Sequence, residues 1–99
     1  MSKIVVEIDS DLEEIIPSFM KGREKDVGLL EEAVGAGDFE KIQSIGHKLK
    51  GNAGSYGFDH MGEIGAGIEQ NAKDKNLPAI EKLFQEYREH LSAIEIKFV

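Results

Sequence analysis

Residues 38–57 read DFEKIQSIGHKLKGNAGSYG, and this stretch decides the fold that we expect for the whole chain. Its apolar residues recur every three or four positions, which is the spacing of one buried face of an α-helix. They are Phe39, Ile42, Ile45, Leu49, Ala53 and Tyr56. Asp38 can cap the start of the helix with its side chain, and Gly57 can end it. We therefore predict an amphipathic helix over residues 38–56.

The side of this helix that faces away from the apolar stripe carries a histidine. On a wheel of about 100° per residue with Ile42 at zero, the stripe falls within about 60° of Ile42. His47 then lies near ~140°, Gly51 near ~180° and Gly54 near ~120°. The sequence thus predicts an exposed imidazole with bare backbone on either side of it.

Glycine is an expensive residue in the interior of a helix. Each one costs about 0.8–1 kcal/mol relative to alanine, so Gly46, Gly51 and Gly54 together lower the stability of this helix. A lone surface histidine is usually only solvated, and glycines often serve close helix packing. Gly51 and Gly54, however, point away from the stripe, so packing does not explain them. Their position favours a site where another macromolecule brings its own surface against His47.

The rest of the chain repeats the helical pattern between short breaks. We expect helices over about 10–16, 17–35, 59–74 and 77–97 in addition to 38–56, with residues 1–9 as a lead-in segment that has no second strand to pair with. Ser10, Asp59 and Pro78 are the expected start signals of three of these helices. The connections are too short for parallel crossovers. The expected fold is all-α, an antiparallel up-and-down four-helix bundle with a short extra N-terminal helix.

Composition narrows the range of functions. The chain has 99 residues, enough for one domain, and a net charge of −7, which disfavours binding to nucleic acid or to an anionic membrane. It has no cysteine, so disulfides, thiolate metal sites and cysteine nucleophiles are excluded. No stretch approaches the roughly 20 apolar residues that span a bilayer, and no signal-peptide pattern is present. We expect a soluble, cytoplasmic protein.

The run from His47 to Phe58, HKLKGNAGSYGF, resembles the signature of the histidine phosphotransfer (HPt) family. That signature is a histidine, any residue, an apolar residue, lysine and glycine, with a further glycine six residues later. The run looks most like the phosphotransfer domains of chemotaxis-type histidine kinases, and the helix pattern fits the family from about Ile15 to Leu91. The resemblance implies a single HPt domain over residues 1–99, either free-standing or part of a larger kinase.

The resemblance also implies a role for individual residues. His47 would accept a phosphoryl group from a receiver-domain aspartyl phosphate or from a histidine kinase and pass it to a receiver-domain aspartate. Lys50 would lie beside the phosphoryl group, and Gly51 would keep the surface open. Glu69, at the position of the family's ring-binding Gln or Glu, would accept the Nδ1–H bond of His47 and leave Nε2 free. Gln70 is the alternative acceptor if the helices rotate.

Receiver domains and a histidine kinase are therefore the expected partners of a monomer. The expected docking surface consists of Gln43, Lys48, Gly51, Gly54, Ser55 and Gln70. No phosphate-binding loop or acidic Mg²⁺ cage is visible, so the chain needs no cofactor of its own and the partner receiver supplies the Mg²⁺. For the same reason we expect a phosphocarrier without kinase activity.

Two other classes of function remain open. A carboxylate-bridged metal bundle would need inward-facing Glu-x-x-His pairs, and the chain has only the reverse spacing, from His60 to Glu63. His90 is expected among surface charges, so no metal site is predicted. The second alternative is a non-catalytic helical module that docks a receiver-like partner, in which the histidine itself would be dispensable.

Overall fold

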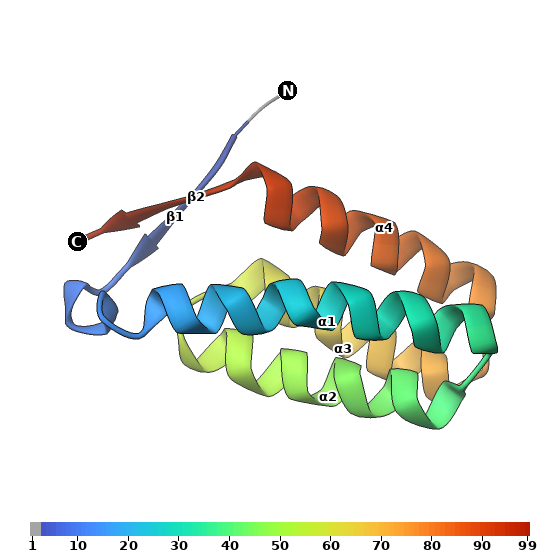
Figure 1. Cartoon of the computed structure of the whole chain (residues 1–99). Coiled ribbons are helices and arrows are strands. Elements are labelled where there is room, and N and C mark those ends of the chain that lie inside the picture. Colours follow the sequence, from blue (N-terminus) through green and yellow to red (C-terminus); the bar gives the residue numbers. More distant parts are fainter. Residues whose placement is uncertain (1–2) are drawn as a thin grey trace.

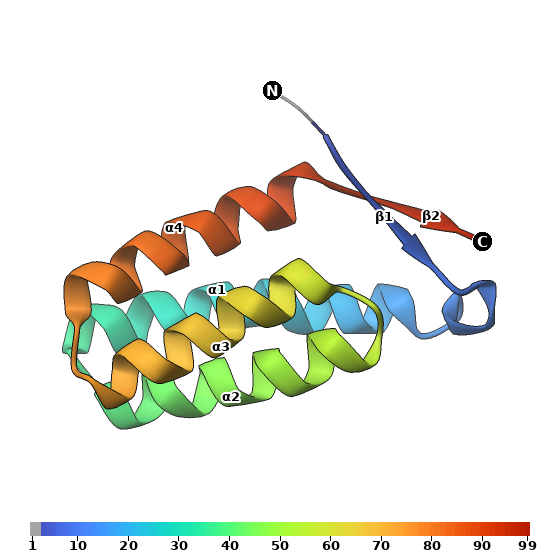
Figure 2. The ribbon, with the colours of Figure 1, turned by 180° about the vertical axis from the view of Figure 1, so that it is seen from behind.

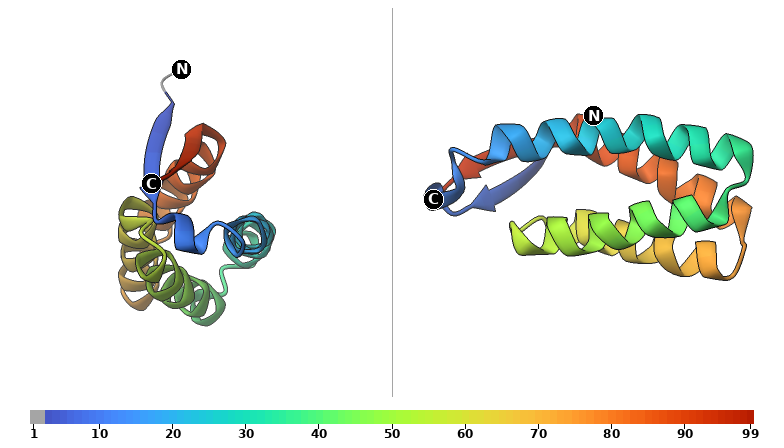
Figure 3. Two further views of the ribbon diagram at one scale, coloured as in Figure 1. Left: turned by 90° about the vertical axis from the view of Figure 1, so that its left-hand side faces the viewer. Right: turned by 60° about the horizontal axis from the view of Figure 1, so that its bottom comes forward.

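The computed structural model describes residues 3–99, and its main body is a bundle of four antiparallel α-helices (Figure 1). The helices are α1 (Ile16–Ala36), α2 (Phe39–Ser55), α3 (Asp59–Lys73) and α4 (Leu77–Ala93). Connections of a few residues reverse the chain between them, and seen nearly end-on they surround a common interior (Figure 3). The all-α up-and-down bundle expected from the sequence is confirmed.

The ends of the helices follow local chemistry. The Asp38 carboxylate accepts from the backbone N–H of Lys41 at 3.2 Å and caps α2, as predicted. Pro17 and Pro78 lie in the first turns of α1 and α4, where a missing N–H costs nothing. The predicted cap at Asp59 is wrong, because Phe58 occupies the cap position and Asp59 is the first residue of α3. There its negative charge still favours the helix N-terminus.

The core is a single apolar cluster to which every helix contributes one face. Its most completely buried large side chains are Ile8, Leu30, Ile42, Leu49, Phe58, Met61, Ile64, Ile68, Ile80 and Tyr87. The helix α2 stripe read from the sequence is part of this cluster, so the opposite side of α2 is left for solvent. Helices α2 and α3 run side by side along their whole length (Figure 2).

Both ends of the chain differ from the sequence-based expectation. Strand β1 (Ile4–Ile8) pairs in parallel with β2 (Ile94–Phe98), with Ile4 opposite Ile94 and Ile8 opposite Phe98. Figure 1 shows the two strands together at one end of the bundle. The lead-in over 1–9 is therefore a strand in its described part, and the helix predicted over 77–97 ends at Ala93. The pairing partner of β1 is β2, which comes from the other end of the sequence and was predicted as part of the last helix.

The short extra helix is also smaller than expected. The segment predicted as a helix over 10–16 forms one 3₁₀ turn, η1 (Ser10–Leu12), and α1 already begins at Ile16. Asp9, not Ser10, caps this turn by accepting from the backbone N–H of Asp11 at 2.9 Å. The turn joins β1 to α1 and so ties the small sheet to the bundle.

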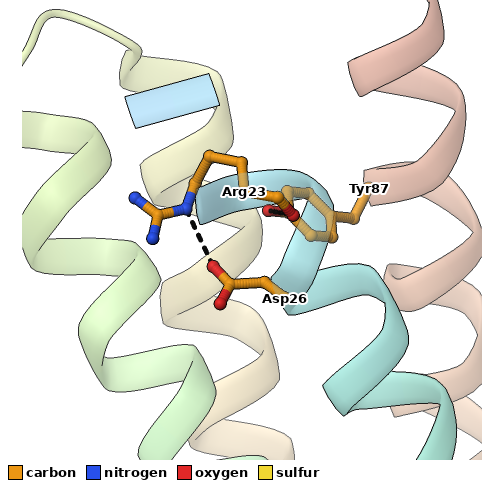
Figure 4. Close-up of polar contacts among 3 residues, drawn as sticks. All are labelled: Arg23, Asp26 and Tyr87. Atoms are coloured by element: carbon orange, nitrogen blue, oxygen red, sulfur yellow. Dashed lines mark hydrogen bonds and ion pairs between the residues drawn. The ribbon is translucent and has the colours of Figure 1, made fainter. Parts of the chain in front are cut away.

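A polar cluster inside the bundle connects α1 to α4 (Figure 4). The Tyr87 hydroxyl donates to the backbone carbonyl of Arg23 at 3.1 Å, and the Arg23 Nε donates to the Asp26 carboxylate at 2.8 Å. Burial, together with the Asp26 charge, raises the pKa of Tyr87, so its hydroxyl remains a donor. Burial also raises the pKa of Asp26, against the opposing effect of Arg23. The hydrogen bond from Tyr87 to Arg23 holds α1 against α4 and does not involve the outer face of α2.

Candidate functional site

His47 lies on the outer face of α2, and 70% of its side chain is exposed. Its neighbours Ile45 and Leu49 are buried, which fixes the rotation of the helix and turns the imidazole outward. The exposed histidine predicted from the helical wheel is therefore present. The polar contacts of the His47 ring come from the neighbouring helix, α3.

Glu69 on α3 is the hydrogen-bond partner of this ring. The Nδ1 atom of His47 lies 2.8 Å from Oε2 of Glu69, a distance that fits a charge-assisted hydrogen bond. Because a carboxylate accepts only, the geometry selects the tautomer with the proton on Nδ1. The nitrogen that remains for chemistry is Nε2, on a ring that is mostly in solvent.

Lys50 contacts the other oxygen of the same carboxylate. Its Nζ lies 3.6 Å from Oε1 of Glu69, and only 13% of the Glu69 side chain is exposed. The hydrogen bond from His47 lowers the pKa of Glu69; burial acts in the opposite direction, and the charges of Lys50 and Lys73 lower the pKa further. Glu69 is thus held as an anion in contact with both the His47 ring and the Lys50 ammonium group.

Gly51 and Gly54 leave the helix surface next to His47 open. Within residues 3–99, no heavy atom of another element lies within 4 Å of a Cβ placed on either glycine. Packing therefore does not explain these two glycines, as the sequence indicated. Gly46 is different: it is buried, and its Cα hydrogens face α3, so it does not belong to the exposed patch.

A surface depression lies beside the ring. It is lined by Glu40, Gln43, Ser44, His47 and Glu69. Gln43 was predicted to belong to the docking surface, but Glu40 and Ser44 were not. Both precede His47 by whole turns of the helix, at i−7 and i−3, and that spacing is the signal that could have identified them.

The remaining residues of the predicted docking surface are Lys48, Ser55 and Gln70, on helices α2 and α3. Lys48 is exposed on α2, and its charge acts on Asp26 of α1. The Ser55 hydroxyl donates to the Gly51 carbonyl at 2.8 Å, so it serves its own helix in this conformation. Gln70 donates to Asp74 at 3.4 Å and is not the partner of His47, a role that Glu69 fills.

Comparison with known families is consistent with this geometry. The family model described as Hpt domain matches residues 14–96, which is most of the chain. The chain belongs to the Hpt domain family. Comparison with curated proteins and with solved structures gave no significant match.

Membership of the family gives the coarse function. Hpt domains are phosphocarrier modules of two-component signalling, and they interact with receiver domains and kinases. No helix within residues 3–99 of this Hpt domain is long and apolar enough to cross a membrane.

The other histidines of the Hpt domain lie by strand β1, at the end of the bundle where the strands pair. The rings of His60 and His90 are 4.9 Å apart, and His60 also lies 3.5 Å from Glu63 and 3.9 Å from Glu86. His90 is only 4% exposed, so its expected place among surface charges was wrong. The described part of the chain holds no cluster of three or more His, Asp or Glu side chains arranged to hold a metal ion.

Proposed function

We propose that the domain carries its phosphoryl group on Nε2 of His47. The observation that supports this most directly is the 2.8 Å contact of Nδ1 with Glu69 on a ring that is 70% exposed. One nitrogen is occupied by a proton that a carboxylate holds in place, and the other presents its lone pair to a partner. A neutral imidazole in this tautomer is a competent nucleophile without any activation by burial.

In the proposed step, Nε2 attacks the phosphorus of an aspartyl phosphate on a receiver domain. The N–P bond forms as the bond between phosphorus and the aspartate oxygen breaks, and the aspartate leaves as a carboxylate. The ring, now bonded to phosphorus and still protonated on Nδ1, carries a positive charge that the Glu69 carboxylate offsets. The reverse step returns the phosphoryl group to a receiver aspartate, and a histidine kinase is the other possible donor.

Lys50 assists this transfer as a mobile charge. Its side chain is 55% exposed and one helical turn from His47, so it can turn from Glu69 toward the oxygens of an incoming phosphoryl group. In-line transfer needs little more than position and charge neutralisation. We therefore propose that the receiver supplies the Mg²⁺, that the chain binds no cofactor, and that it has no kinase activity of its own.

The docking surface in this proposal is the open face around Gly51 and Gly54, with Gln43, Lys48, Ser55 and Gln70 at its edges. Glycine here lets a partner's active-site loops approach the backbone of α2, since Gly51, one turn from His47, has no side chain and the space beside it is open. The partner then meets a monomeric bundle in the cytoplasm, where receiver domains act.

The direct test is transfer from a receiver domain that carries a labelled aspartyl phosphate. We expect label on the protein that is lost in acid and kept in alkali, as for a phosphoramidate. The His47→Gln variant should fold, because the side chain is mostly exposed, and should take up no label.

Two outcomes would contradict the proposal. Label on the His47→Gln variant would place the phosphoryl group elsewhere. Undiminished partner signalling by that variant, with no label on the wild type, would favour the non-catalytic docking module instead.

A further inference from the structure

Helices α2 and α3 touch through glycines at the level of His47. A Cβ placed on Gly46 would lie 2.7 Å from the backbone nitrogen and 3.1 Å from the Cα of Glu69. A Cβ placed on Gly65 would lie 2.6 Å from the backbone nitrogen of Lys50 and 3.0 Å from the carbonyl oxygen of Gly46. Ordinary carbon contacts are about 3.5–4.0 Å, so neither position has room for a methyl group.

The residues met by these two glycines are the ones that form the polar site. Gly46 adjoins His47 in the chain and packs on the backbone of Glu69. Gly65 precedes Glu69 by one turn and packs on the backbone of Lys50. The side chains of His47, Glu69 and Lys50 then meet just outside this contact, at 2.8 Å and 3.6 Å.

We propose that Gly46 and Gly65 are positioning residues for phosphotransfer, because they hold α3 close enough to α2 for the Glu69 carboxylate to fix the Nδ1–H tautomer of His47. The proposal rests on His47 as the phosphorylated residue. It assigns to Gly46 a role distinct from that of Gly51 and Gly54, which keep the outer face open.

The distances around Gly46 explain why an added methyl group there would disturb the hydrogen bond between His47 and Glu69. Both clashing atoms are backbone atoms, which cannot turn aside as the end of a long side chain can. An alanine at position 46 must therefore move α3 outward by several tenths of an ångström at Glu69 itself. A hydrogen bond of 2.8 Å, with a donor and an acceptor on opposite helices, lengthens or breaks under such a displacement.

Gly62 provides a matched control on the same pair of helices. It is buried against α2, but a Cβ there would lie 3.5 Å from both the Gly54 nitrogen and the Lys50 carbonyl oxygen, which is an ordinary contact. Gly62→Ala and Gly46→Ala raise intrinsic helix propensity equally. They differ in whether the added methyl group separates the helices.

The first readout is the state of the His47 ring, measured by ¹⁵N NMR in the absence of any phosphoryl donor. In the wild type and in Gly62→Ala we expect the proton on Nδ1 and the pKa of Glu69 below its ordinary value. In Gly46→Ala we expect a mixture of both tautomers, with the pKa of Glu69 moved back toward that of a free glutamate. Because no transfer is involved, this arm stands even if the proposed function fails.

The second readout is a cycle with Glu69→Gln, scored as the rate of phosphotransfer. In the wild type and in Gly62→Ala, Glu69→Gln should slow transfer by about tenfold, because a neutral amide can still accept the Nδ1–H bond but does not offset the positive charge of the phosphorylated ring. In Gly46→Ala transfer should already be about tenfold slower, and Glu69→Gln should add little. A merely structural loss would leave the Glu69→Gln effect intact in both backgrounds.

A clear result would overturn the proposal. If Gly46→Ala keeps the Nδ1–H tautomer of His47 and the full effect of Glu69→Gln, the glycine contact does not position the carboxylate. Should Gly46→Ala unfold, the same measurements are made in trimethylamine oxide, which favours compact states, and on Gly65→Ala, which pushes on Lys50 instead. Wild-type protein that takes up no label would contradict the proposed function alone.

Discussion

His47 and His90 each face a neighbour on α3, and the two neighbours make them opposite kinds of histidine. His47 is 70% exposed in its side chain and its Nδ1 contacts the Glu69 carboxylate. His90 is 4% exposed, it packs on the ring of His60, and its Nδ1 has no hydrogen-bond partner among residues 3–99. The His47 ring has a carboxylate beside its Nδ1 atom and is open to solvent. The His90 ring has neither.

The difference teaches what makes a histidine available for group transfer in a small bundle. Burial lowers the pKa of His90, and the charge of a protonated His60 lowers it further, while Glu86 acts in the opposite direction. His90 is therefore neutral, as a nucleophile must be, yet no partner can reach it. The role proposed for His47 depends on the combination of access and a fixed tautomer, which no single property of the ring provides.

The largest expected difference is in chemical reactivity. Diethyl pyrocarbonate acylates neutral imidazole, so His47 should react at the rate of an exposed histidine. His90 should react at least about a hundredfold more slowly, because modification must wait for local opening. Peptide mapping by mass spectrometry over time gives both rates in one sample.

His60 is the internal control for that experiment. Its side chain is 53% exposed, so it should follow His47 rather than His90. Equal rates at His47 and His90 would mean that the region under the strands opens freely, and the contrast between the two histidines would be lost.

Local periodicity explains why the exposed face of α2 around His47 could be predicted from the sequence. The stripe of Ile42, Ile45 and Leu49 sets the rotation of α2, and the exposure of His47, Gly51 and Gly54 follows from it. The contact with Glu69 came from the family resemblance, since a wheel drawn for one helix does not place the next. The wheel places Gly46 at about 40° from Ile42, apart from the open glycines, but for the same reason it does not show that Gly46 packs against α3.

The errors at the chain ends have another physical origin. The segment IEIKF at 94–98 continues the helical spacing of Tyr87 and Leu91, but it also alternates with the period of a strand. Pairing with Ile4–Ile8 decided between the two, and that partner lies a whole bundle away in sequence. His90 was misplaced although its spacing from Tyr87 already put it on the buried face.

A second difference between the two histidines should be visible in the pH dependence of stability. The pKa of His90 is below its ordinary value of about 6.5, so between those two values the unfolded chain binds a proton that the folded chain does not. Stability should fall as the pH drops through this range, by up to about 1.4 kcal/mol per pH unit.

The measurement is a set of urea unfolding curves between pH 7.5 and pH 5. The His90→Phe variant keeps an aromatic ring against His60 and should show a shallower loss, with the contributions of all other groups common to both proteins. If the two proteins lose stability in parallel, His90 is protonated as readily in the folded protein as in the unfolded chain.

The smallest effect tests whether the openness around His47 costs the fold anything. Gly51→Ala adds a methyl group that meets no atom of another element among residues 3–99, so it should stabilise the protein by about 0.8–1 kcal/mol. For a domain of this size the melting temperature should rise by about 4–8 °C, as measured by circular dichroism. Gly46→Ala is the contrasting variant, because its methyl group meets the backbone of Glu69 and the helix-propensity gain should be outweighed. A loss of stability in Gly51→Ala would mean that the added methyl group meets a neighbour and that this face of α2 is not open.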